Sequence, residues 1–397
     1  MCQMADILLV GWDDVAAAEA KPIFCPRLTA FRAEAFEVQG FSHPVCSQSR
    51  QAILFGSYGK KIGTWQDIGT QEFVPGLTPP ITLPTLPGVL QGAGYATSLV
   101  GKWHCGPCPD GQHWALAPIQ RGYSAWQAGT RLNLSNGYNN WQRVDAWSNG
   151  VFSVQESVQQ YTTLAQLDAA TNWWATWSGV KRFMHVCFNA PHAPFHVPPE
   201  ELLAGYPAPD LGSTNRQLYH AMLRSADTAF GRLLDLVGPN TVVFLYSDNG
   251  TAGGVAMAGV DPTHGKETTF DPGVRVLILG RWKGCPIGSF PRLNHLVDIP
   301  AGICAAAGVT PPVEWDSSTA ARTAVLLEAQ ISSGAIERAC RTSSRKLRQS
   351  TPLGGTMVEE LYDVIFDPGE TTPLDLNASA EQPALNWLRA RLAEASL

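Results

Sequence analysis

Short, uninterrupted runs of apolar residues recur along the chain, with segments of helical periodicity between them. Runs of this length, rich in β-branched and aromatic side chains, are typical of strands buried on both faces of a parallel sheet. Helical patterns at 82–94 and 216–238 precede two of the runs. This alternation predicts an α/β fold, a large and mostly parallel central sheet with helices on both faces. The predicted strands are Ile7–Val10, Ala96–Val100, Phe183–Phe188, Thr241–Tyr246 and Val274–Leu279.

The chain changes character near Gly308–Pro312. Beyond this point we expect a helical segment, the polar stretch "RTSSRKLRQS", a short strand at Glu359–Val364 and an amphipathic helix around Leu385–Leu392. The sequence therefore predicts a catalytic domain over 1–310 and a small C-terminal α+β subdomain over 311–397.

Polar side chains follow four of the predicted strands. In open parallel sheets, ligands bind beyond the carboxyl ends of the strands, so these groups are expected to meet at one edge. Any one of them alone could be a turn or a helix cap. Their joint position favours a site, and they are Asp13 and Asp14, Lys102 and His104, His192, and Asp248 and Asn249.

The residue types at this edge indicate the chemistry. Carboxylate and amide oxygens suit a hard cation such as Ca²⁺ or Mg²⁺, and Asp13, Asp14, Asp248 and Asn249 supply them. Many cationic groups beside a metal imply an anionic substrate, which indicates hydrolysis of a sulfate or phosphate ester. The cationic groups are Arg50, Lys102, His104, His192 and Lys266.

The stretch "HPVCSQSR" places Cys46 four residues before Arg50, ahead of an apolar segment. If a helix begins here, the two side chains share one face of it. A helix N-terminus and an arginine both favour an anion, which suits a thiolate or a bound oxyanion.

Composition excludes some classes of partner. The chain has 397 residues, with 28 Lys and Arg against 34 Asp and Glu, and no block of like charge. Nucleic acid and an anionic membrane are therefore not expected as main partners. Nine cysteines without framework spacing, together with the lack of a signal-like start, lead us to expect a soluble, cytoplasmic protein. The sequence does not indicate an oligomeric state.

Six segments together resemble the sulfatases of the alkaline-phosphatase superfamily, in that family's order. They are "CSQSR", "GYATSLVGKWHCG", "NAPHAPF", "YSDNG", "GKETTFDPGVRV" and "ELYDVIFDPGE". The similarity extends from Ile7 to about Asn377. It implies an alkaline-phosphatase-like fold and an enzyme that hydrolyses the sulfate ester of a small anionic substrate.

The resemblance also implies roles for the site residues. Asp13, Asp14, Asp248 and Asn249 would hold one divalent cation, Ca²⁺ in preference to Mg²⁺ or Mn²⁺. A formylglycine-generating enzyme would convert Cys46 to formylglycine, whose hydrate binds the metal and attacks the sulfur. By the same resemblance, Arg50 supports the hydrate, His104 is the base, Lys102 and Lys266 bind sulfate oxygens, and His192 binds or protonates the leaving-group oxygen.

One departure from the family motif keeps two alternatives open. Gln48 stands where the motif has Pro or Ala, two residues after Cys46. The chain could therefore be a phosphonate monoester or phosphodiester hydrolase with an unmodified Cys46. It could also be a degenerate relative that binds anions without turnover.

Other motifs admit rival interpretations. Cys105-Gly-Pro-Cys108 has the spacing of a thioredoxin-like redox pair, and with His104 and His113 it could bind zinc. Two ordinary reduced cysteines are the favoured interpretation, because the surroundings match the sulfatase-like segment Gly101-Lys-Trp-His104 and no second Cys-x-x-Cys pair exists to complete a zinc site. Three further residues could line the substrate pocket, namely His264, Trp141 and Trp147.

Overall fold

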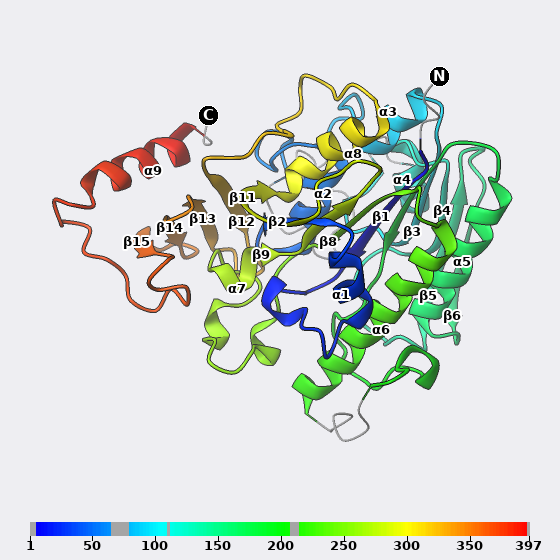
Figure 1. Ribbon diagram of the computed structural model, residues 1–397, viewed down its shortest axis with the longest axis horizontal. Coiled ribbons are helices and arrows are strands. Elements are labelled where there is room, and N and C mark those ends of the chain that lie inside the picture. The colour runs from blue at the N-terminus through cyan, green and yellow to red at the C-terminus, as the bar shows by residue number, and fades with distance from the viewer. Residues whose placement is uncertain (1–4, 65–78, 109–111, 207–213, 395–397) are drawn as a thin grey trace.

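The computed structural model describes residues 5–64, 79–108, 112–206 and 214–394 of the chain. A central sheet runs through the larger lobe, and the C-terminal part of the chain forms a smaller lobe at one side of it (Figure 1). The strands of the central sheet are β1 (Ile7–Trp12), β2 (Phe36–Phe41), β3 (Ala96–Lys102), β4 (Ala125–Thr130), β5 (Trp141–Trp147), β6 (Phe152–Val158), β7 (Arg182–Cys187), β8 (Val242–Ser247), β9 (Arg275–Val276), β10 (Ile278–Arg281) and β11 (Gly288–His295).

The predicted α/β architecture is confirmed. The strand order is β11-β2-β10-β8-β1-β7-β3-β4-β5-β6, with β9 paired to β2 outside this path. The strands β8, β1, β7, β3 and β4 are neighbours and run parallel, so their carboxyl ends lie at one edge of the sheet. Beyond β4, the strands β5 and β6 extend this half of the sheet, and each runs antiparallel to the strand before it.

The helices begin and end where local chemistry supports them. The long helix after residue 213 starts with a capping box between Thr214 and Gln217. The helix that begins at Cys46 ends before Gly56, which adopts the left-handed φ of 58° that suits a glycine. The helices are α1 (Pro26–Arg32), α2 (Cys46–Phe55), α3 (Leu86–Gly92), α4 (Ala117–Gln120), α5 (Thr162–Thr176), α6 (Asn215–Val237), α7 (Asp271–Val274), α8 (Ile299–Ala307) and α9 (Gln382–Glu394).

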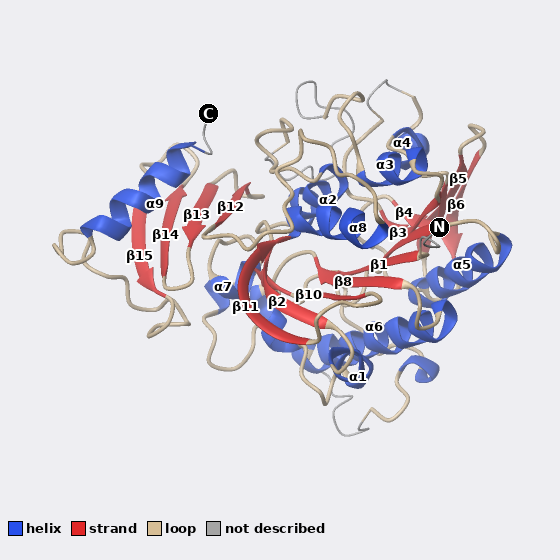
Figure 2. Cartoon of the chain, turned by 45° about the horizontal axis from the view of Figure 1, so that its top comes forward, coloured by secondary structure: helices blue, strands red, loops and turns tan. Residues whose placement is uncertain are grey.

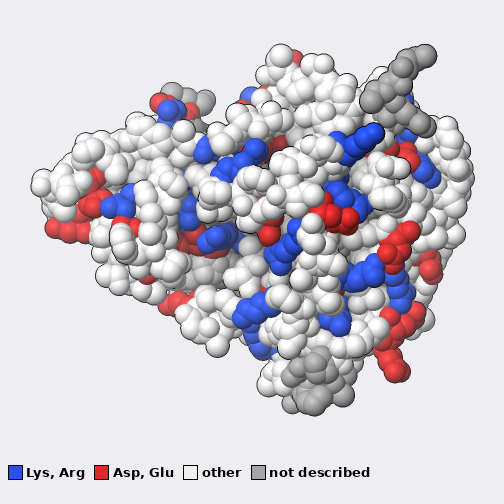
Figure 3. Space-filling view, in the orientation of Figure 1, with Lys and Arg blue, Asp and Glu red and all other residues white. Residues whose placement is uncertain are grey.

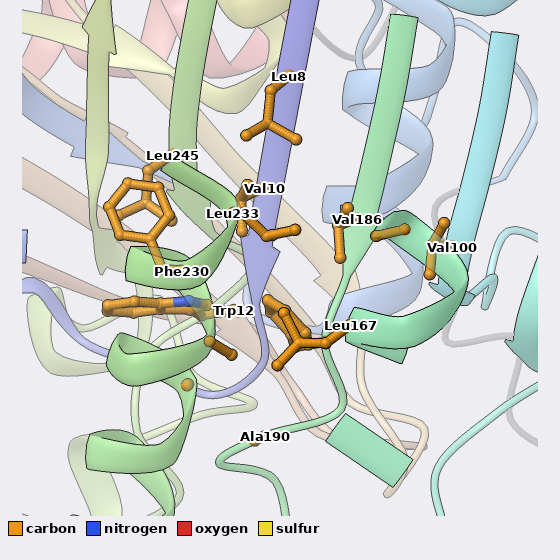
Figure 4. Close-up of a cluster of buried hydrophobic side chains, with 14 of the residues drawn as sticks. Leu8, Val10, Trp12, Val100, Leu167, Val186, Ala190, Phe230, Leu233 and Leu245 are labelled. Atoms are coloured by element: carbon orange, nitrogen blue, oxygen red, sulfur yellow. The ribbon is translucent and has the colours of Figure 1, made fainter. Parts of the chain in front are cut away.

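Alternation along β1 divides the core into two layers. Leu8, Val10 and Trp12 point to the face covered by α1, α5 and α6, where Trp12 lies beside Phe230 (Figure 4). The alternate side chains of β1 point to the opposite face, under α2, α3 and α8. Figure 2 shows these two groups of helices on either side of the sheet. The central strands are buried on both faces because helices cover both.

The smaller lobe is an antiparallel sheet covered by α9 on one face. Its strands are β12 (Val325–Gln330), β13 (Ile336–Arg341), β14 (Arg345–Thr351) and β15 (Val358–Asp363), in that order. Cys340, Leu347 and Leu361 point to α9 and pack against its buried leucines. The strand and the helix expected near the C-terminus are therefore present as β15 and α9. The boundary near residue 310 stays a prediction.

Two expectations were wrong. The run Val274–Leu279 is not one parallel strand, because α7 ends at Val274 and β10 runs antiparallel to β8. The ladder breaks at Leu277, whose amide donates to the Ser247 hydroxyl. The segment after Pro312 is not helical but forms β12 and β13, since Val325 and Leu327 alternate into the core and strand pairing outweighs helix propensity.

Two further observations concern the surface. On the face seen in Figure 3, basic and acidic side chains are interspersed, in agreement with the mixed charge pattern of the sequence. Among the described residues, no helix is both long and apolar enough to cross a bilayer.

Candidate active site

Side chains from separate parts of the chain form one buried cluster at the carboxyl edge of the sheet. Asp13 and Asp14 directly follow β1, and Asp248 follows β8, its parallel neighbour. Atoms of Asp13, Cys46 and Asp248 that could bind a metal lie within 4.8 Å of one another. The same is true of Asp13, Asp14 and His192. The structure thus brings together groups that are as many as 235 positions apart in sequence.

The oxygen-rich part of this cluster suits a cation. Asn249 Nδ2 donates to Asp14 Oδ1 at 2.7 Å, and the Asp14 amide donates to Asp248 Oδ1 at 3.2 Å. Asp13 Oδ1 and Asn249 Oδ1 are buried, and no group in the part of the chain that the structure describes donates a hydrogen bond to them. Buried oxygens without donors are costly unless a cation binds them. The residues present therefore fit a hard divalent metal.

Two buried cations neutralise the central carboxylates. Lys102 Nζ lies 2.5 Å from Asp13 Oδ2, and Arg50 Nη2 lies 2.7 Å from Asp248 Oδ2. Burial raises the pKa of Asp13, but Lys102, His192 and Arg50 outweigh it and hold the pKa well below its usual range. Burial and the charge of Asp13 raise the pKa of Asp248 to about 6. The charges of Asp13 and Asp248 repel each other. A bound cation would stabilise both carboxylates in their charged form.

Cys46 lies at the start of α2, inside this cluster. Its Sγ is 3.2 Å from His104 Nδ1 and 4.0 Å from Lys266 Nζ. Lys266 Nζ also lies 2.6 Å from Asp14 Oδ1. Arg50, one helical turn after Cys46, reaches the carboxylates of Asp13 and Asp248. The predicted pairing of cysteine and arginine on one side of a helix therefore faces a polar, cationic site.

His192 presents one ring nitrogen to the site. Its Nδ1 lies 2.7 Å from the Ala193 carbonyl oxygen, which can only accept, so Nδ1 carries the proton. Nε2 is 3.7 Å from Asp14 Oδ2. Burial lowers the pKa of His192, and Asp14 only partly opposes it. The ring is neutral at pH 7, with the lone pair of Nε2 toward the cluster.

Sequence reasoning missed one residue of the site. Asn133 Oδ1 lies 2.5 Å from Lys102 Nζ, so Lys102 bridges the buried Asp13 and an exposed loop residue. Asn133 follows β4 in a polar stretch that matches no motif. Only its place after another parallel strand could have pointed to it.

The other candidate pocket residues lie elsewhere. The His264 ring stacks on Phe270 at 3.5 Å and packs toward the smaller lobe. Trp141 is buried, and its Nε1 donates to the Gln160 carbonyl oxygen. Trp147 is partly exposed at the end of β5. The contacts of these side chains lie outside the carboxylate cluster.

The redox and zinc interpretations find no support among the described residues. The cysteines there are all free thiols, including Cys105 and Cys108. Their Sγ atoms donate to the carbonyl oxygens of Trp103 and His113. The groups of described residues that could hold a metal include neither cysteine.

The family follows from comparison with known proteins. The model of the sulfatase family matches residues 6–309. The chain belongs to the sulfatase family. It is 28% identical over 338 residues to N-acetylgalactosamine-6-sulfatase of Sus scrofa, an alignment that covers 76% of this chain and 61% of that protein. The chain thus spans about three fifths of the length of the curated relatives it matches.

Solved structures show the same fold. The crystal structure of Ps i-CgsB in complex with k-i-k-neocarrahexaose superposes with a TM-score of 0.80 at 21% identity, covering 99% of this chain and 93% of that one. The PsFucS1 sulfatase from Pseudoalteromonas sp. gives a TM-score of 0.80 at 18% identity, covering 98% and 90%. Sulfatases typically bind a divalent metal, and the oxygen cluster of this family member fits one.

The residues beside Cys46 in this sulfatase-family chain set its proton chemistry. Burial lowers the pKa of His104 well below its usual value, and Lys102 and Arg50 lower it further. The imidazole is therefore neutral and can accept a proton. Burial raises the pKa of the Cys46 thiol to about 11, although Lys102 and Lys266 oppose the rise. An unmodified Cys46 is thus a thiol at neutral pH.

This pKa predicts slow alkylation of any unconverted Cys46. With a pKa of about 11, roughly 10⁻⁴ of the side chain is thiolate at pH 7. The rate of reaction with iodoacetamide should rise about tenfold per pH unit between pH 7 and pH 10. The measurement is mass spectrometry of the tryptic peptide 33–50, with the peptide of the less buried Cys285 as reference. Alkylation that is already rapid at pH 7, with a rate that does not change between pH 7 and pH 10, would instead support a thiolate nucleophile.

Proposed function

We propose that this chain hydrolyses a sulfate ester, with formylglycine formed from Cys46 as the nucleophilic residue. The observation that carries the proposal is the position of the Cys46 side chain. It lies within 4.8 Å of carboxylate oxygens of Asp13 and Asp248, and 3.2 Å from a neutral His104. A side chain here has a metal-binding oxygen set on one side and a base on the other.

We propose that Asp13, Asp14, Asp248 and Asn249 hold one divalent cation, with Ca²⁺ favoured over Mg²⁺ or Mn²⁺. All four supply hard oxygen atoms, and Asp13 Oδ1 and Asn249 Oδ1 have no hydrogen-bond partner within the described ranges. When bound, the cation would supply positive charge to an oxygen nucleophile and to the sulfate group. The ion would also help to neutralise the carboxylates that form ion pairs with Lys102, Arg50 and Lys266.

The chain's own residues would bind the sulfate and move protons around it. Lys102 pairs with Asp13 and Lys266 pairs with Asp14, and both lysines would bind sulfate oxygens there. The neutral His104 would take a proton from the side chain at position 46. Arg50 holds Asp248 and would keep the nucleophile in place.

His192 would serve the leaving group. In the resting protein its Nε2 bears a lone pair, so it must gain a proton before it can donate one. A bound sulfate ester brings negative charge beside the imidazole and raises its pKa. The protonated ring would then give its Nε2 proton to the departing oxygen.

The substrate class we propose is a sulfated sugar. A relative 28% identical to this chain is named N-acetylgalactosamine-6-sulfatase, and one structural neighbour is described in complex with k-i-k-neocarrahexaose. These names describe those proteins. They support testing sulfated amino sugars and sulfated galactans first.

One observation favours a second candidate. Gln48 replaces the motif residue that is expected two positions after Cys46, and its buried Nε2 has no hydrogen-bond partner among the residues that the structure describes. If this substitution prevents conversion, the site retains its cations with a thiol at position 46. It would then act on phosphonate monoesters or phosphodiesters, or bind anions without turnover.

The test combines mass and activity. Protein is made with and without a formylglycine-generating enzyme and digested with trypsin. Mass spectrometry of the peptide 33–50 then shows whether position 46 carries an aldehyde or a thiol. Sulfate release from an aryl sulfate and from N-acetylgalactosamine 6-sulfate is measured with Ca²⁺, beside phosphate release from matched phosphate esters. We expect aldehyde and sulfate release to rise together. Intact thiol in every preparation, with phosphoester cleavage only, would contradict the proposal.

A further inference from the structure

The loop that carries Lys266 is held in an unfavourable conformation. Lys266 points into the carboxylate cluster, and the next residue, Glu267, adopts a φ of 71°. Side chains other than glycine rarely adopt this left-handed region, so surrounding contacts must hold the residue there. The Glu267 amide donates to the Pro44 carbonyl oxygen, two residues before Cys46. A shift of this loop would therefore move Lys266 relative to the nucleophile.

Much of the support for this loop comes from the smaller lobe. The Ser332 hydroxyl, in the turn between β12 and β13, donates to Glu267 Oε2 at 2.6 Å. The Thr269 hydroxyl donates to Glu337 Oε2 at 3.1 Å, and Arg348 Nε donates back to the same hydroxyl at 3.1 Å. Glu267 and Thr269 are thus bound to a turn and to strands of the smaller lobe, more than sixty residues later in the chain.

The end of the loop is held by a buried ionic network. Lys346 Nζ lies 2.9 Å from Asp271 Oδ1 and 2.9 Å from Glu370 Oε1. Arg341 Nη2 lies 3.2 Å from Asp271 Oδ2. A Glu370 carboxylate oxygen accepts the Asp271 amide. These groups leave Asp271 little freedom, because cations bind both of its oxygens.

The smaller sheet is built to present charge to this loop. Along β13 and β14, alternate residues such as Cys340 and Leu347 pack on α9. The other alternation faces the loop, and its charged members are 0–8% exposed. Apolar side chains could join two lobes at lower desolvation cost, whereas buried ion pairs impose a defined geometry. We call these residues the charged face: Glu337, Arg341, Lys346 and Arg348.

We propose that the charged face of the C-terminal sheet positions Lys266 for sulfate binding. The inference rests on the proposed function, because it assigns a support to one of the sulfate-binding residues. The residues of the charged face are positioning residues, since they touch the loop and not the cluster. The smaller lobe is then part of the catalytic apparatus.

The test removes one ion pair of the charged face and leaves the net charge of the protein unchanged, although Glu360 also loses its contact with Arg348. In a Glu337→Met/Arg348→Met variant, Thr269 loses both side-chain partners, while two apolar residues replace a buried ion pair of similar volume. Such replacements are often neutral for folding. The matched control is Arg345→Met/Glu381→Met, because Arg345 belongs to the same strand but pairs within the smaller lobe. A milder variant, Ser332→Ala, removes only the contact to Glu267.

Two measurements decide the proposal. We expect kcat/KM for the sulfate ester to fall at least about tenfold in the Glu337→Met/Arg348→Met variant, and less than about twofold in the control. Hydrogen exchange of the amides at 265–271 should accelerate in the first variant and in Ser332→Ala, but not in the control. Faster exchange without a fall in kcat/KM, or a fall of equal size in the control, would overturn the positioning role.

The exchange measurement separates this proposal from the proposed function. If the parent protein hydrolyses no sulfate ester, the proposed function fails while exchange still reports on the loop. If the amides at 265–271 exchange at the parent rate in both Glu337→Met/Arg348→Met and Ser332→Ala, the inference is overturned, whatever the activity. If the double variant does not fold, Ser332→Ala still tests whether the contact of the smaller lobe with Glu267 holds the loop.

Discussion

Replacing Cys46 by alanine should lower kcat/KM for a sulfate ester by at least about 10⁴-fold, because the variant has no side chain that can become the nucleophile. The other groups of the site would remain, including His104 and the carboxylates around Asp13. They would leave only the residual catalysis that binding and charge supply. The measurement is sulfate release over time at saturating Ca²⁺, from protein coproduced with a formylglycine-generating enzyme.

The matched control for this variant is Cys304→Ala, which removes a buried thiol from α8, away from the site. Both variants should lose about 1 kcal/mol or less of unfolding free energy, since each removes one small buried group. Cys304→Ala should keep its activity within about twofold. Hydrolysis by Cys46→Ala above one hundredth of the parent rate would show that position 46 does not supply the nucleophile.

The part of the site predicted from the sequence is the part that parallel strands dictate. Asp13 and Asp248 follow buried apolar runs, and such runs pair in parallel with their carboxyl ends at one edge. Two residues far apart in sequence therefore had to lie close together. The same argument places Lys102 at the end of β3. Periodicity and strand order sufficed here, because the positions depend on the sheet and not on loop conformation.

What the sequence left open depends on contacts between loops and lobes. Asn133 reaches Lys102 from a loop after β4, and no periodicity determines the path of that loop. The sequence over β12 and β13 favours a helix, since its alternation is short and helix-forming alanines precede it. Because the sequence does not predict these strands, the contacts of Lys346 and Arg348 with the Lys266 loop could not be predicted either.

Removing divalent metal should abolish hydrolysis and lower the thermal stability of the folded protein. Buried oxygens such as Asp13 Oδ1 and Asn249 Oδ1 have no donor among the described residues, so a cation that binds them stabilises the native state only. At a free Ca²⁺ concentration of about 100 times Kd, this linkage contributes about 2.7 kcal/mol. Chelation should therefore lower Tm by several degrees, and calcium should restore both Tm and activity.

An Asp13→Asn variant tests whether the stabilisation arises at this site. It removes one carboxylate charge of the cluster and leaves Lys102 without its buried partner, so calcium should shift its Tm by less than about a third of the parent shift. Asp227→Asn is the matched control, because Asp227 is also buried but accepts amides of Arg27 and Leu28 at the start of α1. Its intrinsic stability will fall, yet its calcium-induced shift should equal that of the parent. An equal calcium response in Asp13→Asn would place the stabilising ion elsewhere, and the carboxylates would then be balanced by Lys102, Arg50 and Lys266 alone.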